Sequence, residues 1–116
     1  KREYYDSGEL KSEWFEINGL KEGEYKLYYE NEKLKEISYY VNGKQEGEYK
    51  SFHQNGQLKE ISYYVNGQKE GEYKEYHING NISVLCHYIN DKLEGEYKKY
   101  YQIKSIFPYL SVKVSA

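Results

Sequence analysis

Three histidines are the side chains of this sequence best suited to bind a metal ion or to transfer a proton. His53 and His77 are 24 residues apart, and the period of two along a β-strand would place both rings on one face of a sheet with one strand between them. Since neighbouring strands lie ~4.8 Å apart, the two imidazoles would be roughly 10 Å apart, too far to share one zinc ion at ~2.0 Å per bond. Tyr29 and Tyr101 continue the same spacing. The two histidines are therefore interpreted as amphipathic rings that substitute for tyrosine, and no metal site is predicted.

The remaining nucleophile and acid–base candidates do not form a catalytic set. Cys86 is the single cysteine and His87 follows it directly, so on a strand the two side chains face opposite sides and form no thiolate–imidazole pair. Cys86 is expected to be a small buried hydrophobic residue. Paired carboxylates such as Glu22 with Glu24 recur at regular intervals and are interpreted as parts of solvated turns. The sequence predicts no enzyme activity and no cofactor.

The tetrapeptide Gly-Glu-Tyr-Lys is a candidate for anion binding that we interpret otherwise. Its glycine lacks the strand-to-helix context of a phosphate loop, and it is expected to give the backbone the geometry needed at the entrance of a strand. Its lysine follows a glutamate by two residues, on the same strand face, so the charge is locally neutralised. With 17 Lys plus Arg against 19 Asp plus Glu, the net charge is −2, which favours neither nucleic acid nor an anionic membrane. The tetrapeptides begin at Gly23, Gly47, Gly71 and Gly95, and their lysines are Lys26, Lys50, Lys74 and Lys98.

These tetrapeptides define an uninterrupted 24-residue repeat, which predicts an array of repeated structural units. Other positions, including the turn glycines Gly43 and Gly67, follow the same step. The predicted organisation is a repeat array over residues 1–102, followed by a divergent C-terminal cap or edge strand over residues 103–116. Within the array, residues 1–22 are a partial repeat, 23–46, 47–70 and 71–94 are full repeats, and 95–102 is a second partial repeat.

Each repeat contains two strand-like runs, for example Glu24 to Glu30 and Leu34 to Val41. Asn55-Gly56 marks one kind of turn, because Asn and Gly tolerate the positive φ that tight hairpins require. Helices are disfavoured, since turn signals recur about every eight residues and isolated helices that short are marginal. Neither face of a run is purely apolar, so the prediction is an all-β fold: an elongated, single-layer antiparallel β-meander of tandem 24-residue hairpins. Which face of the first strand joins which face of the second stays open, because a bulge at Asn55-Gly56 would reverse the match.

Tyrosine is the dominant aromatic residue, with 17 copies against 3 of Phe. Its ring packs against cross-strand neighbours while its hydroxyl stays hydrated. Two roles are compatible with this pattern: the rings hold the sheet together, or one face presents them as anchors for a protein or peptide partner. The candidate binding face comprises Tyr25, Tyr49, Tyr73 and Tyr97 from the first strands and Tyr40, Tyr64 and Tyr88 from the second strands.

The two ends of the sequence carry separate expectations. Near the C-terminus Lys104 stands where a turn glycine is expected, and Pro108 interrupts an apolar end; this favours an edge or cap strand, or alternatively an edge that pairs with a second copy of the chain. The chain opens at Lys1 within a repeat and contains no Met, so we expect further sequence upstream. The single cysteine slightly favours the cytoplasm, but export stays open, since a leader would lie upstream.

The repeat spelling resembles a known family. Gly-Glu-Tyr-Lys-x-Tyr/Phe-Tyr/His-x-Asn-Gly-x-Leu-Lys-Glu, closing on Tyr-Tyr-Val-Asn-Gly-x-x-Glu, is similar to the MORN repeat, and more closely to its bacterial variant in YwqK-like antitoxin proteins. The resemblance covers residues 2 to about 101, with departures at Glu32, Asp91 and Lys104, where glycine is expected. It implies an elongated, twisted sheet of hairpins that mediates protein–protein contacts and, in some eukaryotic relatives, membrane or lipid association. The expected function is a non-catalytic interaction or scaffolding module, with an antitoxin-like role as its narrower form; the alternative is a membrane-surface or lipid-associated scaffold.

Overall fold

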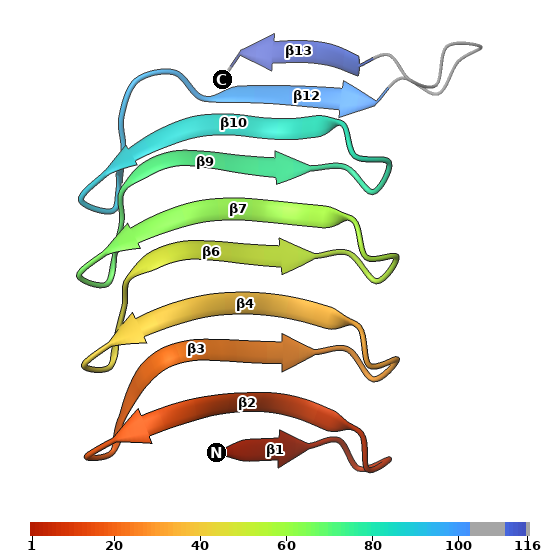
Figure 1. Cartoon of the computed structure of the whole chain (residues 1–116). Coiled ribbons are helices and arrows are strands. Elements are labelled where there is room, and N and C mark those ends of the chain that lie inside the picture. Colours follow the sequence, from red (N-terminus) through yellow and green to blue (C-terminus); the bar gives the residue numbers. More distant parts are fainter. Residues whose placement is uncertain (103–110, 116) are drawn as a thin grey trace.

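The computed structural model describes residues 1–102 and 111–115, and in these residues the chain forms one antiparallel sheet of strands joined by turns (Figure 1). The molecule measures 52 × 37 × 15 Å. All described strands lie on one hydrogen-bonded path or pair with a strand of that path, so within these residues no second sheet is packed against the first. The predicted all-β, single-layer meander is confirmed.

Successive strands pair in chain order, except that three two-residue arms lie off the main path and pair only with the strand before them. The predicted run Leu34 to Val41 is one strand, as expected. The first run of the later repeats is preceded by such an arm, whereas in the first full repeat the equivalent residues are continuous with the run in one strand, Leu20–Tyr28. The sequence indicated neither arrangement. The arms are β5 (Lys44–Gln45), β8 (Gln68–Lys69) and β11 (Lys92–Leu93). The main strands are β1 (Arg2–Tyr4), β2 (Leu10–Ile17), β3 (Leu20–Tyr28), β4 (Leu34–Val41), β6 (Gly47–Phe52), β7 (Leu58–Val65), β9 (Gly71–Tyr76), β10 (Ile82–Ile89), β12 (Lys98–Gln102) and β13 (Ser111–Ser115).

The register between β3 and β4 decides which strand faces combine. Tyr25 lies opposite Ser38, and Glu24 lies opposite Tyr39. Because residues paired across strands share a face, Tyr25 joins Ser38 and Tyr40, and the alternate residues join Tyr39. A bulge does occur, between Leu27 and Tyr28, but it lies beyond these pairs and leaves the match intact.

The turn between β4 and β5 is a two-residue hairpin, with Val41 paired to Lys44. Asn42 and Gly43 have φ values of +49° and +80°, the left-handed pair that matches the twist of the flanking strands. The backbone N–H of Asn42 donates to Glu22 Oε2 of the preceding hairpin at 2.7 Å. The equivalent bonds join Asn66 to Glu46 and Asn90 to Glu70. These recurring glutamates are therefore not merely solvated, because each one links its hairpin to the next turn.

The turn between β3 and β4 has a different geometry from the one expected. Gly56, in the equivalent turn of the next repeat, has a φ of +89°, but Asn55 and Asn79 are not among the described residues with positive φ. Asn55 instead accepts the Gln57 N–H on its side-chain Oδ1 at 2.9 Å. The prediction of positive φ for the Asn of this turn is thus wrong: the loop is a type I turn followed by one left-handed residue, and its Asn contributes a side-chain hydrogen bond.

Glu32 occupies the left-handed position of its turn with a φ of +72°, where three other repeats have Gly8, Gly56 and Gly80. A non-glycine residue is strained in this conformation by ~1–2 kcal/mol. Glycine removes the strain, but it loses more conformational entropy on folding, and this offsets part of the gain. We expect Glu32→Gly to raise the free energy of unfolding by about 1 kcal/mol, measured by urea denaturation. The control is Asp91→Gly: Asp91 also has a positive φ of +69°, but its Oδ1 accepts the Lys69 N–H at 2.9 Å, so a smaller gain is expected. A lower stability of Glu32→Gly would contradict the strain argument.

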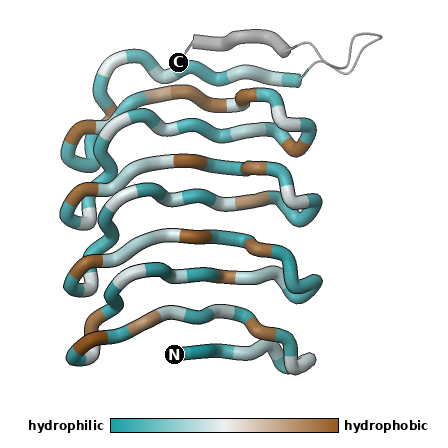
Figure 2. The backbone as a smooth tube through the Cα atoms, viewed as in Figure 1, coloured by the Kyte–Doolittle hydropathy of each residue, from teal (hydrophilic) through white to brown (hydrophobic). Residues whose placement is uncertain are grey.

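The face that carries Tyr25 is the more buried one. The buried hydrophobic residues are Tyr73, Val84 and Cys86, while Ser12, Ser38, Ser51 and Ser62 are buried polar residues. Small serines beneath the rings let the tyrosines of adjacent strands close over the sheet. Figure 2 shows hydrophobic residues recurring at the same place in successive hairpins, as expected for an array held by contacts between neighbours.

The last strand of the sheet departs from the repeat. β13 pairs antiparallel with β12, placing Ser115 opposite Lys98. Lys50 is equivalent to Lys98 two repeats earlier, and it pairs with Ile61. The residue two repeats after Ile61 is Tyr109. Because Lys98 pairs with Ser115 instead, β13 is displaced by six residues from the register of the repeat. The predictions for Lys104, Pro108 and the apolar residues beside them concern positions outside the described residues. Nowhere in residues 1–102 and 111–115 does the structure contain a helix able to span a membrane.

Candidate functional site: two aromatic faces of the sheet

The predicted binding tyrosines lie together on the more buried face, which we call the tyrosine ladder. In each full repeat a first-strand ring meets a second-strand ring edge to face: the centroids are 6.1 Å apart for Tyr25 and Tyr40, and 5.6 Å apart for Tyr73 and Tyr88. The Tyr49–Tyr64 pair has the same arrangement, at 6.3 Å and 69°. Such pairs contribute ~0.5–1.5 kcal/mol each beyond the area they bury. Tyr97 packs against the buried cluster at the end of the array.

Two ladder hydroxyls, those of Tyr49 and Tyr73, form hydrogen bonds with carboxylates of the same face. The Tyr49 hydroxyl donates to Glu36 Oε1 at 2.9 Å, and the Tyr73 hydroxyl is within hydrogen-bond distance of both Glu60 and Glu75. Burial, and then these carboxylates, raise the pKa of both tyrosines well above the ordinary value. The rings are therefore neutral hydrogen-bond donors that hold the sheet together, and their role as partner contacts stays a prediction.

Glu60 is a partly buried carboxyl group whose pKa is raised, chiefly by burial, from an ordinary value of 4.5. Because its pKa is higher in the folded state, folded Glu60 keeps its proton over a pH range in which the unfolded state has lost it. The contribution of Glu60 to the free energy of unfolding therefore falls as the pH rises through this range. We expect Glu60→Gln, which keeps an acceptor oxygen for Tyr73, to reduce the loss of free energy of unfolding between pH of about 4.5 and about 7. Urea denaturation across this range measures it, with Glu36→Gln in the preceding repeat as the matched substitution. An unchanged pH profile would contradict the assignment.

Two lysines lie over the ladder. Lys21 Nζ is 4.4 Å from the ring centroid of Tyr25 and 5.1 Å from that of Tyr40. Lys69 Nζ is 4.8 Å from Tyr73 and 5.0 Å from Tyr88. Each ammonium group is thus close enough to two rings for cation–π attraction.

A second set of rings is exposed on the opposite face, and the sequence did not single it out. Phe15 is 70% exposed, Tyr39 is 38% exposed and Tyr63 is 39% exposed. Two residues further along each strand stands an exposed aliphatic side chain, such as Val65 at 53%. The exposed row, as we call it, consists of Phe15, Tyr39, Tyr63 and His87, with Ile17, Val41, Val65 and Ile89. Both columns keep the 24-residue step, a signal present in the sequence, but strand alternation does not say which of two similar faces is left uncovered.

Charged residues between the exposed rings are paired with one another. Glu24 lies opposite Tyr39 and Glu48 lies opposite Tyr63, and each glutamate forms an ion pair with the lysine two residues further along its strand. The distances are 3.0 Å for Lys26, 3.1 Å for Lys50, 3.1 Å for Lys74 and 3.3 Å for Lys98. The predicted local neutralisation of these lysines is confirmed.

The histidines bind backbone carbonyls of the next hairpin. His53 Nε2 donates to the Tyr76 carbonyl at 3.0 Å, and His77 Nε2 donates to the Tyr100 carbonyl at 2.8 Å; a carbonyl only accepts, so Nε2 carries the proton. Tyr29 makes the same contact to the Phe52 carbonyl through its hydroxyl, at 2.6 Å. Both histidines thus act here as tyrosine substitutes. Among the described positions no three His, Cys, Asp or Glu side chains are grouped to hold a metal ion.

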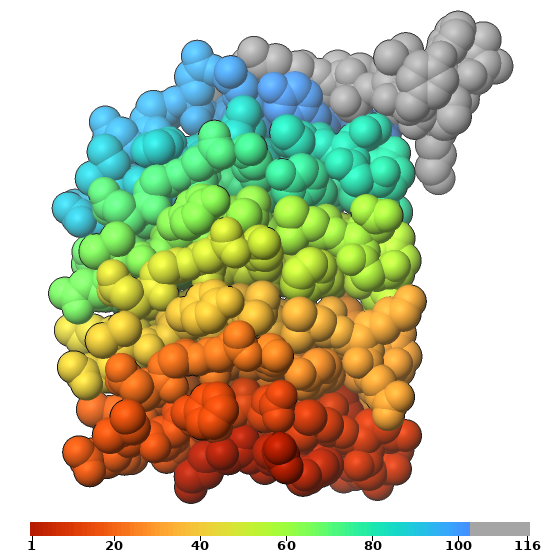
Figure 3. All heavy atoms as spheres, viewed as in Figure 1, coloured from red at the N-terminus to blue at the C-terminus, as the bar shows by residue number. Residues whose placement is uncertain are grey.

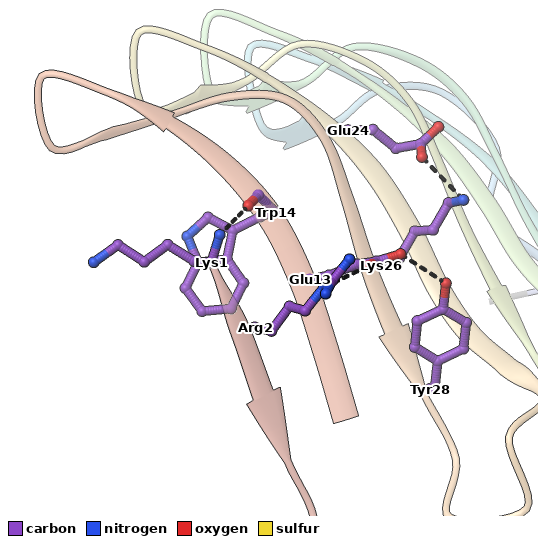
Figure 4. A network of polar contacts seen from close by, with 7 residues as sticks. All are labelled: Lys1, Arg2, Glu13, Trp14, Glu24, Lys26 and Tyr28. Carbon is purple, nitrogen blue, oxygen red and sulfur yellow. Dashed lines mark hydrogen bonds and ion pairs between the residues drawn. The ribbon is translucent and has the colours of Figure 1, made fainter. Parts of the chain in front are cut away.

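Cys86 is buried and His87 is exposed, so the two lie on opposite faces as predicted. A hollow of about 490 Å³ lies beside β1 and β2. Figure 4 shows its polar contacts: Arg2 pairs with Glu13 at 3.5 Å, and the N-terminal ammonium donates to the Trp14 carbonyl at 2.8 Å. These contacts fasten β1 to β2. Elsewhere on the face seen in Figure 3 the hairpins form successive bands of packed side chains.

Comparison with known proteins agrees with this architecture. The family model described as the MORN repeat variant matches residues 21–42, 45–66 and 69–90. The first matched segment begins within β3 and the other two begin in the arms β5 and β8; each runs through a full hairpin to the Asn of the following turn. No curated protein and no solved structure matches the chain significantly. MORN repeats are generally associated with modules that bind proteins or membranes, and the family is typically non-catalytic. The three matches cover more than half of the chain, which therefore belongs to the MORN repeat variant family.

Proposed function

We propose that the chain is a protein-interaction or scaffolding module whose partner docks on the exposed row. The observation that carries this proposal is the row itself: aromatic and branched aliphatic side chains stay exposed at the same two positions of consecutive hairpins. Single exposed apolar residues are ordinary, but rows of them mark interaction surfaces. Tyr and Phe are also enriched in protein interfaces.

The spacing of the exposed row supports a partner of a particular chemistry. Two strands per hairpin give a spacing of roughly 10 Å between equivalent rings, so the partner should present apolar side chains at that interval. The glutamates between the rings are already paired with lysines. The partner therefore needs an apolar ridge with balanced charge, such as one face of another protein's strand or helix.

The test requires an identified partner. The protein would be used to capture partners from native lysate, and the affinity of each identified partner would be measured by calorimetry against the double variant Tyr39→Ala with Tyr63→Ala. Two exposed aromatic anchors at ~1–2 kcal/mol each predict a loss of affinity of about 100-fold.

The control double variant is Lys33→Ala with Gln57→Ala, at exposed positions in the turns at the other end of the strands, and it should bind like the parent. Equal binding by both double variants would contradict docking on the row. If Tyr49→Phe in the ladder weakened binding instead, the predicted tyrosine face would be the docking site. A monomer that binds no partner at micromolar concentration would contradict the interaction function itself.

An antitoxin role is a narrower hypothesis, supported by the resemblance of the repeat spelling to antitoxin-like relatives. It predicts that a neighbouring reading frame encodes a toxin whose growth inhibition is relieved by co-expression of this chain. Relief that survives Tyr39→Ala with Tyr63→Ala would separate such a role from the exposed row.

A membrane-surface scaffold is the second candidate, because the most exposed hydrophobic side chains of the row, Phe15 and Ile17, are of the kind that enter a lipid interface. The net charge of −2 and the paired lysines provide no attraction for anionic lipid. We expect no sedimentation with phosphatidylcholine–phosphatidylserine vesicles, and co-sedimentation lost in Phe15→Ser would favour the membrane candidate.

A further inference from the structure

The three full ring pairs of the tyrosine ladder share one backbone geometry but not one set of charges. Two residues before the glycine of Gly-Glu-Tyr-Lys stand Lys21, Gln45 and Lys69 in successive hairpins. Their carbonyls accept equivalent hydrogen bonds from Gly43, Gly67 and Asp91, each at 2.9 Å. The three side chains therefore leave the backbone from matching places.

In two of these hairpins the chain supplies its own ammonium group. Lys21 lies over Tyr25 and Tyr40, with Trp14 as a third ring at 5.6 Å, and Lys69 lies over Tyr73 and Tyr88. In the middle hairpin the rings of Tyr49 and Tyr64 keep the same tilt and separation. Across residues 1–102, no lysine or arginine lies over either of them at cation–π distance.

The middle pair is also bordered by two carboxylates that form no ion pair, although the charge of Lys69 acts on one of them, Glu60. Glu36 accepts a hydrogen bond from the Tyr49 hydroxyl at 2.9 Å. The charge of Glu60 acts on both rings and adds to the burial that raises the pKa of Tyr49 and Tyr64. None of the ion pairs within residues 1–102 uses Glu36 or Glu60. A cation placed here would gain from two ring faces and two carboxylates together.

We propose that the Tyr49–Tyr64 pair, with Gln45 beside it and Glu36 and Glu60 at its border, is a binding seat for a primary ammonium group on an alkyl stem, as on a lysine side chain. The hairpins before and after show the expected bound arrangement, because each places a lysine ammonium group over the equivalent pair of rings. Lys21 and Lys69 each lie about one hairpin, or roughly 10 Å, from the seat, close to the screening length at physiological salt, so their repulsion is weak there. The seat is on the face opposite the exposed row and does not depend on it.

The experiment titrates single probes against protein carrying ¹³C-labelled tyrosine rings at physiological salt, with Tyr49 and Tyr64 assigned by Tyr→Phe substitution. The probe is N-α-acetyl-lysine methylamide, and the matched neutral probe is N-α-acetyl-norleucine methylamide. Since one cation–π site contributes little free energy, we expect saturable shifts of the Tyr49 and Tyr64 rings with a Kd of the order of millimolar. The norleucine probe should give none. Choline, tested separately, distinguishes a quaternary from a primary ammonium.

Two variants supply the decisive controls. Gln45→Lys installs the residue that the neighbouring hairpins already carry and should weaken probe binding at least about tenfold, because the chain then fills its own seat. Lys69→Gln should open a second seat, so that the rings of Tyr73 and Tyr88 begin to respond to the probe. Both changes reproduce residues native to equivalent positions, and unchanged urea midpoints would verify that they fold.

Three results would overturn the assignment: equal shifts with the norleucine probe, undiminished binding in Gln45→Lys, or no response of Tyr73 and Tyr88 in Lys69→Gln. Binding of choline without binding of the lysine probe would overturn the assignment to a primary ammonium group.

Discussion

Replacing Tyr73 with alanine is expected to lower the free energy of unfolding by about 3 kcal/mol, within the range for removing a buried aromatic ring. Tyr73 is only 9% exposed and meets the Tyr88 ring at 5.6 Å. A single-layer sheet has no second layer that could collapse into the space that the ring leaves. Removal of the ring would expose its neighbours Val84 and Cys86, each only 4% exposed, to water.

The matched control for this prediction is Tyr63→Ala. Tyr63 is also a tyrosine of a central hairpin, but it belongs to the exposed row with 39% exposure, and its loss should cost about 1 kcal/mol or less. Tyr73→Phe separates the ring from its hydroxyl and should cost about 1 kcal/mol, as for one hydrogen bond. Urea denaturation of the three variants measures the differences. Equal destabilisation by Tyr73→Ala and Tyr63→Ala would show that the two faces contribute alike and would invalidate the distinction between ladder and row.

Gly43→Val is expected to cost about 2 kcal/mol, because the β-branched side chain must adopt a left-handed backbone conformation. Gly43 has a φ of +80° in the two-residue turn that sets the register of β4 and β5. A Cβ atom at this position would also lie 3.1 Å from Leu20 Cδ2 of the preceding hairpin, so the Leu20 side chain would have to move. The substitution therefore strains one turn and disturbs its contact with the neighbouring repeat.

Gly43→Asn is the control at the same position. Asparagine and aspartate tolerate the left-handed region, and Asp91 occupies the equivalent turn position with a φ of +69°. We expect Gly43→Asn to cost clearly less than Gly43→Val in urea denaturation. If the two variants were equally unstable, contact with Leu20 and not backbone strain would dominate the cost.

Several features of the fold could be read directly from the sequence. The 24-residue step, the strand Leu34–Val41 and the second turn at Asn42-Gly43 follow from local rules, because a two-residue turn with positive φ at both positions strongly prefers these residues. The ion pair of Lys26 with Glu24 was equally predictable, since residues two apart on a strand share a face. The conformation of Asn55 was not: Asn serves in left-handed turns and as a side-chain acceptor, and the loop length that decides between them depends on the register of the paired strands.

The candidate sites divide in the same way. The sequence identified Tyr25, Tyr49 and their equivalents as one set, and the structure brings them together as a ladder. It did not distinguish that ladder from the exposed row of Tyr39 and Tyr63, because both are periodic and both mix aromatic with charged residues. The lysines above the rings were also missed, since Lys69 belongs to a short arm and Lys21 to the equivalent start of β3, and neither segment is visible as a strand in the sequence.

By itself, then, the sequence determined a repeating antiparallel ribbon, because periodicity, turn residues and strand alternation act over a few residues and recur in every copy. Only the tertiary structure decided which face is buried, which tyrosines remain exposed and which ring pair lacks an ammonium group of its own. The physical reason is that these properties arise from contacts between hairpins about 24 residues apart. In those contacts strand register, bulges and the return of the short arms determine which side chains meet.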